Sequence, residues 1–157
     1  MNRFLLDTNI LLAYLRGHDL YRQIEKDHQL AGPDAVILIS VTTKAELMSI
    51  SIQNGWGEKK ILQLDAYLRK LIIIDVNEAD QDLMKTYANI DAFSQGRLEG
   101  KPLVGTSARN MGKNDIWIAA TANVTNSALI TTDGDFDHLN GHFIELIKYP
   151  SPSSPTK

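Results

Sequence analysis

The sequence contains five acidic residues at positions from which carboxylates can act together. Each follows a short apolar run, or lies in the first turns of a segment that reads as a helix. Several carboxylates in one cleft repel one another, so they are stable together when cations lie between them. Oxygen ligands in a chain without cysteine suit Mg²⁺ or Mn²⁺. The five candidate metal ligands are Asp7, Glu46, Asp115, Asp133 and Asp135.

Alternating strands and helices are needed to bring these acids together. Apolar runs rich in branched residues predict buried strands, and the stretches between them predict helices. Strands that alternate with helices form a parallel sheet covered on both faces, and ligands bind beyond the carboxyl ends of its strands. The acids are therefore expected to converge at one edge of the sheet. The predicted strands are residues 3–6, 36–40, 71–74, 128–131 and 143–146, and the predicted helices are residues 11–15, 19–30, 41–52, 58–70, 77–95 and 115–122.

Length and composition limit the class of protein. A chain of 157 residues with 43% hydrophobic residues is expected to form one domain, over residues 1–149, followed by a Pro- and Ser-rich disordered tail over residues 150–157. The lack of cysteine excludes a disulfide scaffold, a thiolate zinc site and a thiol nucleophile. Without a long apolar segment, no membrane association is predicted and a cytoplasmic protein is expected. The net charge of −3 argues against a broadly basic surface, so nucleic acid has to contact a local patch.

Each acid also has a purely structural interpretation that the sequence leaves open. Asp7 can cap the helix that follows it. Thr43 and Glu46 have the spacing of a capping box, in which the glutamate bonds back to the start of the helix. Asp115 can stabilise a helix N-terminus electrostatically, and Asp133 begins a turn dipeptide. The shared placement of the acids, rather than any one of them, therefore carries the prediction of a metal site.

Four short segments follow one another along the chain in a recognisable order. Residues 4–9 end in Asp-Thr-Asn, Glu46 lies near a helix start, residues 114–122 begin with Asn-Asp, and residues 129–136 contain Thr-Thr-Asp-Gly-Asp. Together they resemble the PIN-domain family, and most of all the VapC-type ribonuclease toxins of bacterial toxin–antitoxin pairs. The resemblance extends from Arg3 to Leu146. It implies a three-layer α/β/α sandwich with a central, mainly parallel five-stranded sheet.

The resemblance also implies an activity, a cofactor and partners. The expected activity is that of a Mg²⁺- or Mn²⁺-dependent endoribonuclease, which hydrolyses RNA to 3′-hydroxyl and 5′-phosphate ends. The expected partners are the RNA substrate, a small antitoxin protein and a second copy of the chain in a homodimer. The family positions correspond to Asp7, Glu46, Asp115 and Asp133 as catalytic metal ligands, Asp135 as a further ligand, and Asn9 and Thr132 as supporting polar residues.

The irregular stretch between residues 96 and 114 is the candidate for RNA contact. It contains four basic residues and one acid, and it leads directly into Asp115. Arg109 and Lys113 are expected to bind phosphates beside the metal. A solvated loop whose charges serve solubility is the alternative. The four histidines are scattered and are interpreted as surface or packing residues, so no histidine base is expected.

Two other functions remain open on the sequence alone. A catalytically inactive PIN-like module would bind RNA or protein without cleaving it, although intact acids at all four family positions favour the nuclease. A phosphotransfer domain would need a phosphoacceptor aspartate at the end of a central strand and a lysine at the end of a late strand. Asp75 meets the first requirement, but residues 128–132 contain no lysine. The nuclease is therefore the preferred hypothesis.

Overall fold

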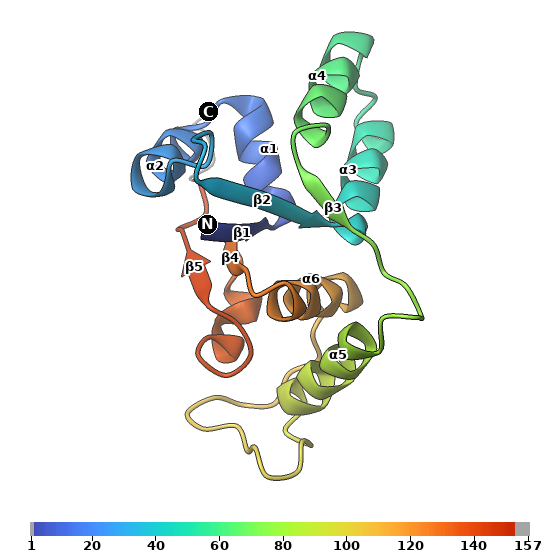
Figure 1. The fold of residues 1–157 in the computed structure, drawn as a ribbon, viewed down its shortest axis with the longest axis vertical. Helices are drawn as coiled ribbons and strands as arrows, with labels where there is room; N and C mark the ends of the chain where they lie inside the picture. Colours follow the sequence, from blue (N-terminus) through green and yellow to red (C-terminus); the bar gives the residue numbers. More distant parts are fainter. Residues whose placement is uncertain (1, 153–157) are drawn as a thin grey trace.

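The computed structural model describes residues 2–152, which form a five-stranded sheet that is parallel throughout (Figure 1). The strand order is β3-β2-β1-β4-β5, so the first strand of the chain lies at the centre, between β2 and β4. This arrangement confirms the predicted α/β fold class. The strands are β1 (Asn2–Leu6), β2 (Ala35–Ser40), β3 (Ile72–Ile74), β4 (Ala128–Thr131) and β5 (Leu146–Lys148).

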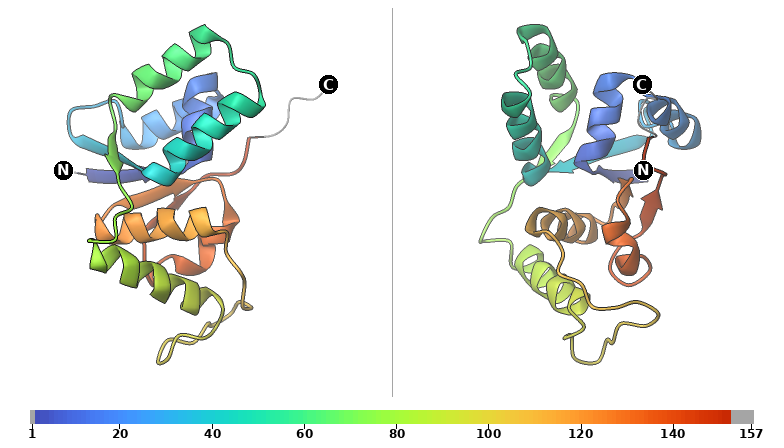
Figure 2. Two further views of the ribbon diagram at one scale, coloured as in Figure 1. Left: turned by 90° about the vertical axis from the view of Figure 1, so that its right-hand side faces the viewer. Right: turned by 180° about the vertical axis from the view of Figure 1, so that it is seen from behind.

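Helices cover both faces of the sheet and complete the predicted three layers. In Figures 1 and 2, helices α1 to α4 lie on one side of the sheet, and α5, α6 and the 3₁₀ helix η1 lie on the other. The helices are α1 (Thr8–Arg16), α2 (Asp19–His28), α3 (Val41–Gln53), α4 (Glu58–Leu68), α5 (Gln81–Ser94), α6 (Lys113–Val124) and η1 (Gly134–Leu139).

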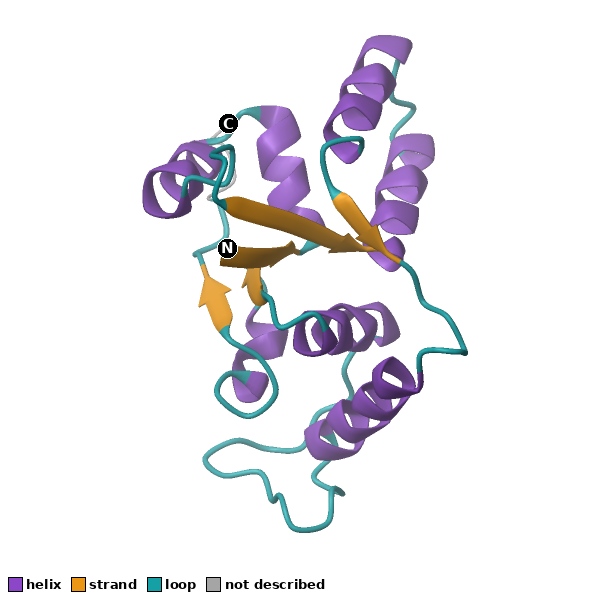
Figure 3. Cartoon of the chain, in the orientation of Figure 1, coloured by secondary structure: helices purple, strands orange, loops and turns teal. Residues whose placement is uncertain are grey.

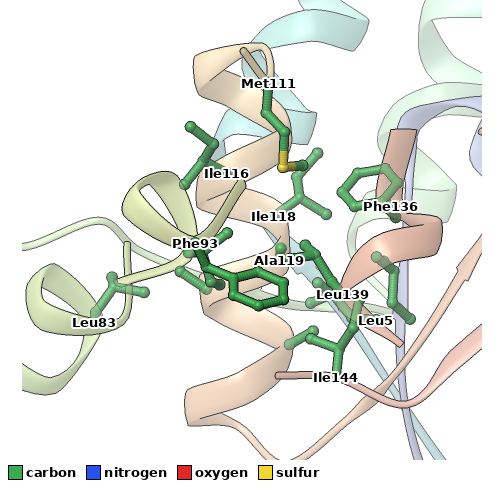
Figure 4. Packing of buried hydrophobic residues seen from close by; sticks show 14 of the residues in the cluster. Leu5, Leu83, Phe93, Met111, Ile116, Ile118, Ala119, Phe136, Leu139 and Ile144 are labelled. Carbon is green, nitrogen blue, oxygen red and sulfur yellow. The ribbon is translucent and has the colours of Figure 1, made fainter. Parts of the chain in front are cut away.

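Alternate residues of the central strand face opposite layers, as the pleat of a strand requires. Leu5 belongs to the apolar cluster beneath α5, α6 and η1, where it is joined by Phe93 and Phe136 (Figure 4). Its neighbours Phe4 and Leu6 belong to the cluster beneath α1 to α4. Burial on both faces explains why this strand reads as a continuous apolar run rather than an alternating one.

Helix α5 begins later than the sequence predicts. The predicted helix starts at Asn77, whereas α5 starts at Gln81. The side chain of Asn77 instead accepts a hydrogen bond from the backbone N–H of Ala79 at 2.9 Å, which closes a turn. Asp80 is the N-cap, because its Oδ1 accepts from the backbone N–H of Leu83 at 3.0 Å.

The last strand also lies elsewhere than predicted. The prediction of a strand over residues 143–146 is wrong, since β5 spans Leu146–Lys148. The backbone N–H groups of Phe143 and Ile144 both donate to the carbonyl of Leu139, which turns the chain back from η1. Both side chains still pack in the core, so their apolar character reflects burial, and Ile144 pairs only in an isolated bridge with Asn140.

The connection between α5 and α6 contains no helix or strand in the structure (Figure 3). Loops of this length are uncommon in compact domains, and many of them are functional. Backbone hydrogen bonds fix both ends of the connection to the last turn of α5. The N–H of Arg97 donates to the carbonyl of Ala92, and the N–H of Arg109 donates to the carbonyl of Ser94, each at 2.8 Å.

Residues 150–152 continue beyond β5 without regular structure. There Ser151 donates a hydrogen bond of 3.5 Å to the carbonyl of Thr132. Residues 153–157 lie outside the described part of the chain, so the predicted domain boundary at residue 149 and the disordered tail stay predictions. No helix between residues 2 and 152 is long and apolar enough to cross a membrane.

Candidate active site

The five acids gather at the edge of the sheet where the parallel strands end. Asp7 directly follows β1, and Asp133 lies two residues past the end of β4. Glu46 lies in α3, which begins immediately after β2, and Asp115 lies in the first turn of α6. Because β2, β1 and β4 are neighbours in the sheet, their carboxyl ends direct these acids to one place.

Asp7 is both a helix cap and a member of this cluster. Its side chain is only 5% exposed. One carboxylate oxygen accepts from the backbone N–H of Thr8 at 2.7 Å, and the other accepts from the hydroxyl of Thr131 at 2.7 Å. Burial raises the pKa of Asp7, although these two hydrogen bonds act in the opposite direction. The capping interpretation and the site interpretation therefore hold for the same carboxylate.

Glu46 does not form a capping box. The N-cap of α3 is Ser40, whose hydroxyl accepts from the backbone N–H of Thr42 at 3.2 Å. Thr43 consequently lies within the helix, where its buried hydroxyl has no hydrogen-bond partner among the described residues. The carboxylate of Glu46 accepts from the hydroxyl of Thr8 at 3.1 Å, which turns it toward the end of β1. The capping-box interpretation is wrong because the helix begins before the threonine that it requires.

Asp115, Asp133 and Asp135 form the tightest group of carboxylates. Each offers one oxygen, and these three oxygens lie within 4.8 Å of one another. Asp133 is the N-cap of η1, and its Oδ1 accepts from the backbone N–H of Asp135 at 2.9 Å. The start of η1 and the start of α6 therefore place three carboxylates around one point.

The other four carboxylates act on Asp115 electrostatically. The pKa of Asp115 is raised to about 7. Burial is the largest cause, followed by the negative charges of Asp7, Asp133, Glu46 and Asp135. Burial and four nearby negative charges together favour the protonated form of Asp115, so this carboxyl lies in a negative field.

No basic side chain within residues 2–152 forms an ion pair with the five acids. The two ion pairs described there join Arg22 to Asp19 and Lys148 to Asp137, so neither involves the five acids. Carboxylates that are partly withdrawn from water and lack a basic partner are stabilised by a divalent cation with a preference for oxygen. The donor set of this site therefore fits Mg²⁺ or Mn²⁺.

Thr131 takes the supporting position that the sequence assigns to Thr132. The Thr131 hydroxyl donates to Asp7 and accepts from the backbone N–H of Asp133 at 3.0 Å. Thr132 is half-buried and Asn9 is exposed, and neither makes a side-chain hydrogen bond in the described part of the chain. Side chains alternate along β4, so the last residue of the strand and its successor cannot both point at Asp7. No feature of the sequence distinguishes the two adjacent threonines.

The two basic residues predicted to contact RNA lie in different surroundings. Lys113 is exposed at the first position of α6, two residues before Asp115. Arg109 is half-buried in the connection, and its guanidinium donates to the hydroxyl of Thr106 at 3.2 Å. Arg109 lies near the end of the connection and Lys113 at the start of α6. Of the two, only Arg109 makes a side-chain hydrogen bond within the described residues.

We expect the metal-free protein to lose stability as the pH rises from about 4 to about 7. The pKa of an aspartate in the unfolded chain is 3.8, whereas the pKa of Asp115 in the folded chain is about 7. Between these values the folded state binds more protons, so the free energy of unfolding falls with rising pH and levels off above pH 7. Thermal unfolding followed by circular dichroism measures this.

Asp115→Asn is expected to remove much of this pH dependence. The matched control Asp65→Asn, at an exposed position of α4, should keep it. Stability that rises through pH 7 in the metal-free parent protein would contradict the raised pKa.

Comparison with known proteins supports the family resemblance. A family model described as PIN domain matches residues 4–141, which include all five acids. The resemblance inferred from the four sequence segments is therefore confirmed. No curated protein sequence matches the chain significantly.

Several solved structures are similar to the chain over nearly their whole length. One is VapBC2 from Rickettsia felis bound to a DNA fragment from their promoter, with 26% identity, a TM-score of 0.68, and coverage of 94% of this chain and 98% of that one. VapBC-1 from nontypeable Haemophilus influenzae has 24% identity and a TM-score of 0.66, with coverage of 93% and 97%. VapBC-5 from Mycobacterium tuberculosis has 24% identity and a TM-score of 0.59, with coverage of 95% and 100%.

Proposed function

The chain belongs to the PIN-domain family, and from this premise we propose that it is a Mg²⁺- or Mn²⁺-dependent endoribonuclease, the toxin of a toxin–antitoxin pair. One observation carries the proposal. Five carboxylates gather where β2, β1 and β4 end, and no basic side chain of the described residues pairs with them. Such a site attracts a divalent cation, and a divalent cation beside a phosphodiester supports its hydrolysis.

The residues best placed to hold the ion are those whose oxygens lie closest together. Asp115, Asp133 and Asp135 meet this condition, and Asp7 and Glu46 add to the negative field around them. When bound, the ion supplies a Lewis acid that activates water and stabilises charge on the leaving 3′ oxygen.

Two threonines hold the carboxylates in place before any ligand arrives. Thr8 donates its backbone N–H to Asp7 and its hydroxyl to Glu46. Thr131 donates to Asp7 and accepts from the backbone of Asp133. Partners of this kind orient metal ligands and reduce the reorganisation that binding requires. The two threonines are therefore positioning residues of the proposed site.

The proposed mechanism does not use a histidine base. His138 follows the acids in η1, but its Nε2 lies 2.7 Å from the hydroxyl of Ser94 and its ring stacks on Phe93. Burial lowers the pKa of His138, and the nearby charge of Arg109 acts in the same direction. These contacts agree with the interpretation of His138 as a packing residue.

Replacing both Arg109 and Lys113 with Ala is expected to weaken RNA binding and its dependence on salt. On a single strand, each lost phosphate contact makes the negative slope of log K against log salt shallower by about 0.7. The slope of the double variant should therefore be shallower than that of the parent protein by about 1.4. Fluorescence anisotropy with labelled RNA at several salt concentrations measures the slope. The control Lys26→Ala and Lys59→Ala, at exposed positions of α2 and α4, should leave it unchanged. An unchanged slope in the Arg109 and Lys113 variant would show that RNA binds elsewhere.

The similar structures motivate the proposal of a protein partner. One of them is a toxin–antitoxin complex from Klebsiella pneumoniae, with 23% identity to this chain, a TM-score of 0.61, and coverage of 93% of this chain and 98% of that one. We therefore propose a small antitoxin as partner of this chain. Its inhibition would follow from an Arg or Lys side chain inserted among the unpaired carboxylates. A homodimer is our further expectation, and light scattering of the isolated chain measures it.

The experiment that tests the proposed function separates it from a PIN-like module that only binds. Purified protein is incubated with a mixed RNA and Mg²⁺, and the product ends are determined. The proposal expects new 5′-phosphate and 3′-hydroxyl ends. RNA that is bound but stays intact would favour the binding module.

A further inference from the structure

A cavity that none of the five acids lines lies between η1 and the connection from α5 to α6. Its volume is about 390 Å³, within the range of small-ligand pockets. One side is formed by the connection between α5 and α6, including Val104 and Arg109, and the other by η1 and the turn after it, including Asn140 and His142. Because η1 begins directly after Asp133, the cavity and the acids share one structural element.

The cavity presents a positive charge without a carboxylate partner. Arg109 lines it and forms no ion pair within residues 2–152, where its guanidinium contacts only the hydroxyl of Thr106. The acid that lines the same cavity, Asp137, is already paired with Lys148 at 2.6 Å. A guanidinium with free N–H groups binds phosphate oxygens well. The cavity is therefore suited to an anion, in contrast to the acids next to it.

The cavity also presents a surface suited to a nucleobase. His142 is exposed, and its ring packs on Phe93 with 5.3 Å between ring centroids. Val104 is 85% exposed, although it is apolar. Asn140 accepts a backbone hydrogen bond through Oδ1 from Leu146, which leaves its amide N–H₂ group to donate. An exposed imidazole face with an apolar neighbour and a nearby donor is typical of sites that bind an unstacked base.

The shape of the cavity is set before a ligand arrives. Ser94 is fully buried, and its carbonyl accepts a hydrogen bond of 2.8 Å from the backbone N–H of Arg109. Its hydroxyl lies 2.7 Å from Nε2 of His138. Ser94 thus ties the connection to η1. These two contacts reduce the cost of ordering Arg109 and η1 when a ligand binds.

We propose that this cavity is a subsite for one ribonucleotide of the RNA, next to the phosphodiester that is cleaved. Arg109 binds a phosphate of that nucleotide, and its base lies against His142 and Val104. The inference rests on the proposed function, since it assumes that RNA reaches the acids. A strand whose cleaved phosphodiester lies at the proposed metal site would reach the cavity along η1, which begins directly after Asp133.

The test combines base removal in the RNA with side-chain removal in the protein. A series of short RNAs is used, each with one abasic nucleotide at a different position. RNA affinity is measured by fluorescence anisotropy with the full-length Asp115→Asn protein, because this variant is expected to cleave too slowly to degrade the RNA during the measurement. At one position, loss of the base should weaken binding about tenfold, the cost typical of a lost stacking contact. The same abasic RNA should lose much less affinity when His142→Ala is also present.

Two further variants make the result specific. His142→Phe keeps an aromatic face, so removal of the base should again weaken RNA binding in this variant. In Lys26→Ala, at an exposed position of α2, removal of the base should weaken RNA binding as much as it does without this substitution. If base removal costs the same with and without His142 at every position, the subsite is overturned, while cleavage of the RNA by the parent protein still supports the proposed function. If the parent protein neither binds nor cleaves RNA, the proposed function fails and the subsite fails with it.

Discussion

Replacing Asp115 with Asn should lower kcat/KM for RNA cleavage by about 100-fold or more, which corresponds to about 2.7 kcal/mol of lost transition-state stabilisation. Asp115 belongs to the tightest group of carboxylates, so its neutralisation removes both a ligand oxygen and a charge from the proposed metal site. Loss of a residue that only orients a metal ligand costs about 10- to 100-fold, so a ligand should cost at least as much. Initial rates with a labelled RNA at saturating Mg²⁺ measure the effect.

The same variant should be more stable than the parent protein when metal is absent. At pH 8 the Asp115 carboxyl is charged, partly buried and repelled by four other acids, and Asn removes that repulsion. Each kcal/mol of relief raises the melting temperature of a domain of this size by about 2–4 °C. A more stable but inactive protein excludes unfolding as the cause. A variant that keeps a third or more of the parent rate would remove Asp115 from the catalytic site.

Replacing Glu46 with Gln should weaken Mn²⁺ binding by about tenfold or more and slow RNA cleavage in parallel. The affinity of a carboxylate site depends on the number of its charged ligands, and a unit charge near a divalent ion is worth more than 1.4 kcal/mol at protein-like dielectric. The shape of the side chain is retained, and Gln can still accept from the hydroxyl of Thr8. Calorimetric titration with Mn²⁺ gives the affinity directly.

A second glutamate provides the matched control. Glu58 lies exposed in the first turn of α4, so Glu58→Gln makes the same chemical change near a helix start and away from the acids. It should leave Mn²⁺ affinity and cleavage unaltered. Equal behaviour of the two variants would show that Glu46 does not hold metal.

The fold and the acids could be predicted because they depend on strong local signals. The apolar run before Asp7 and the one that ends at Thr131 favour buried strands, and parallel strands place their carboxyl ends together. The prediction that the acids converge needs no knowledge of side-chain direction. It needs only that each acid stands just beyond a strand or in the first turns of a helix.

The sequence could not predict details that depend on the exact residue at which a strand or helix begins or ends. Thr131 and Thr132 are chemically identical, and only the pleat of β4 decides which one meets Asp7. Ser40 and Thr43 are both good caps, and the choice between them depends on where β2 ends. The cavity that includes Arg109 brings together the 95–112 connection and η1 through Ser94, a contact between distant residues that local patterns do not encode.

The most direct test of the account is a cleavage assay with and without metal. A defined single-stranded RNA is incubated with the parent protein in Mg²⁺, in excess chelator, and in chelator followed by excess Mg²⁺, beside Asp7→Asn in Mg²⁺. If the protein is a metal-dependent nuclease, the parent protein cleaves the RNA in the first and third reactions alone, with 5′-phosphate products, and Asp7→Asn cleaves none above background. Cleavage that persists in chelator, or that Asp7→Asn performs at the parent rate, would contradict it.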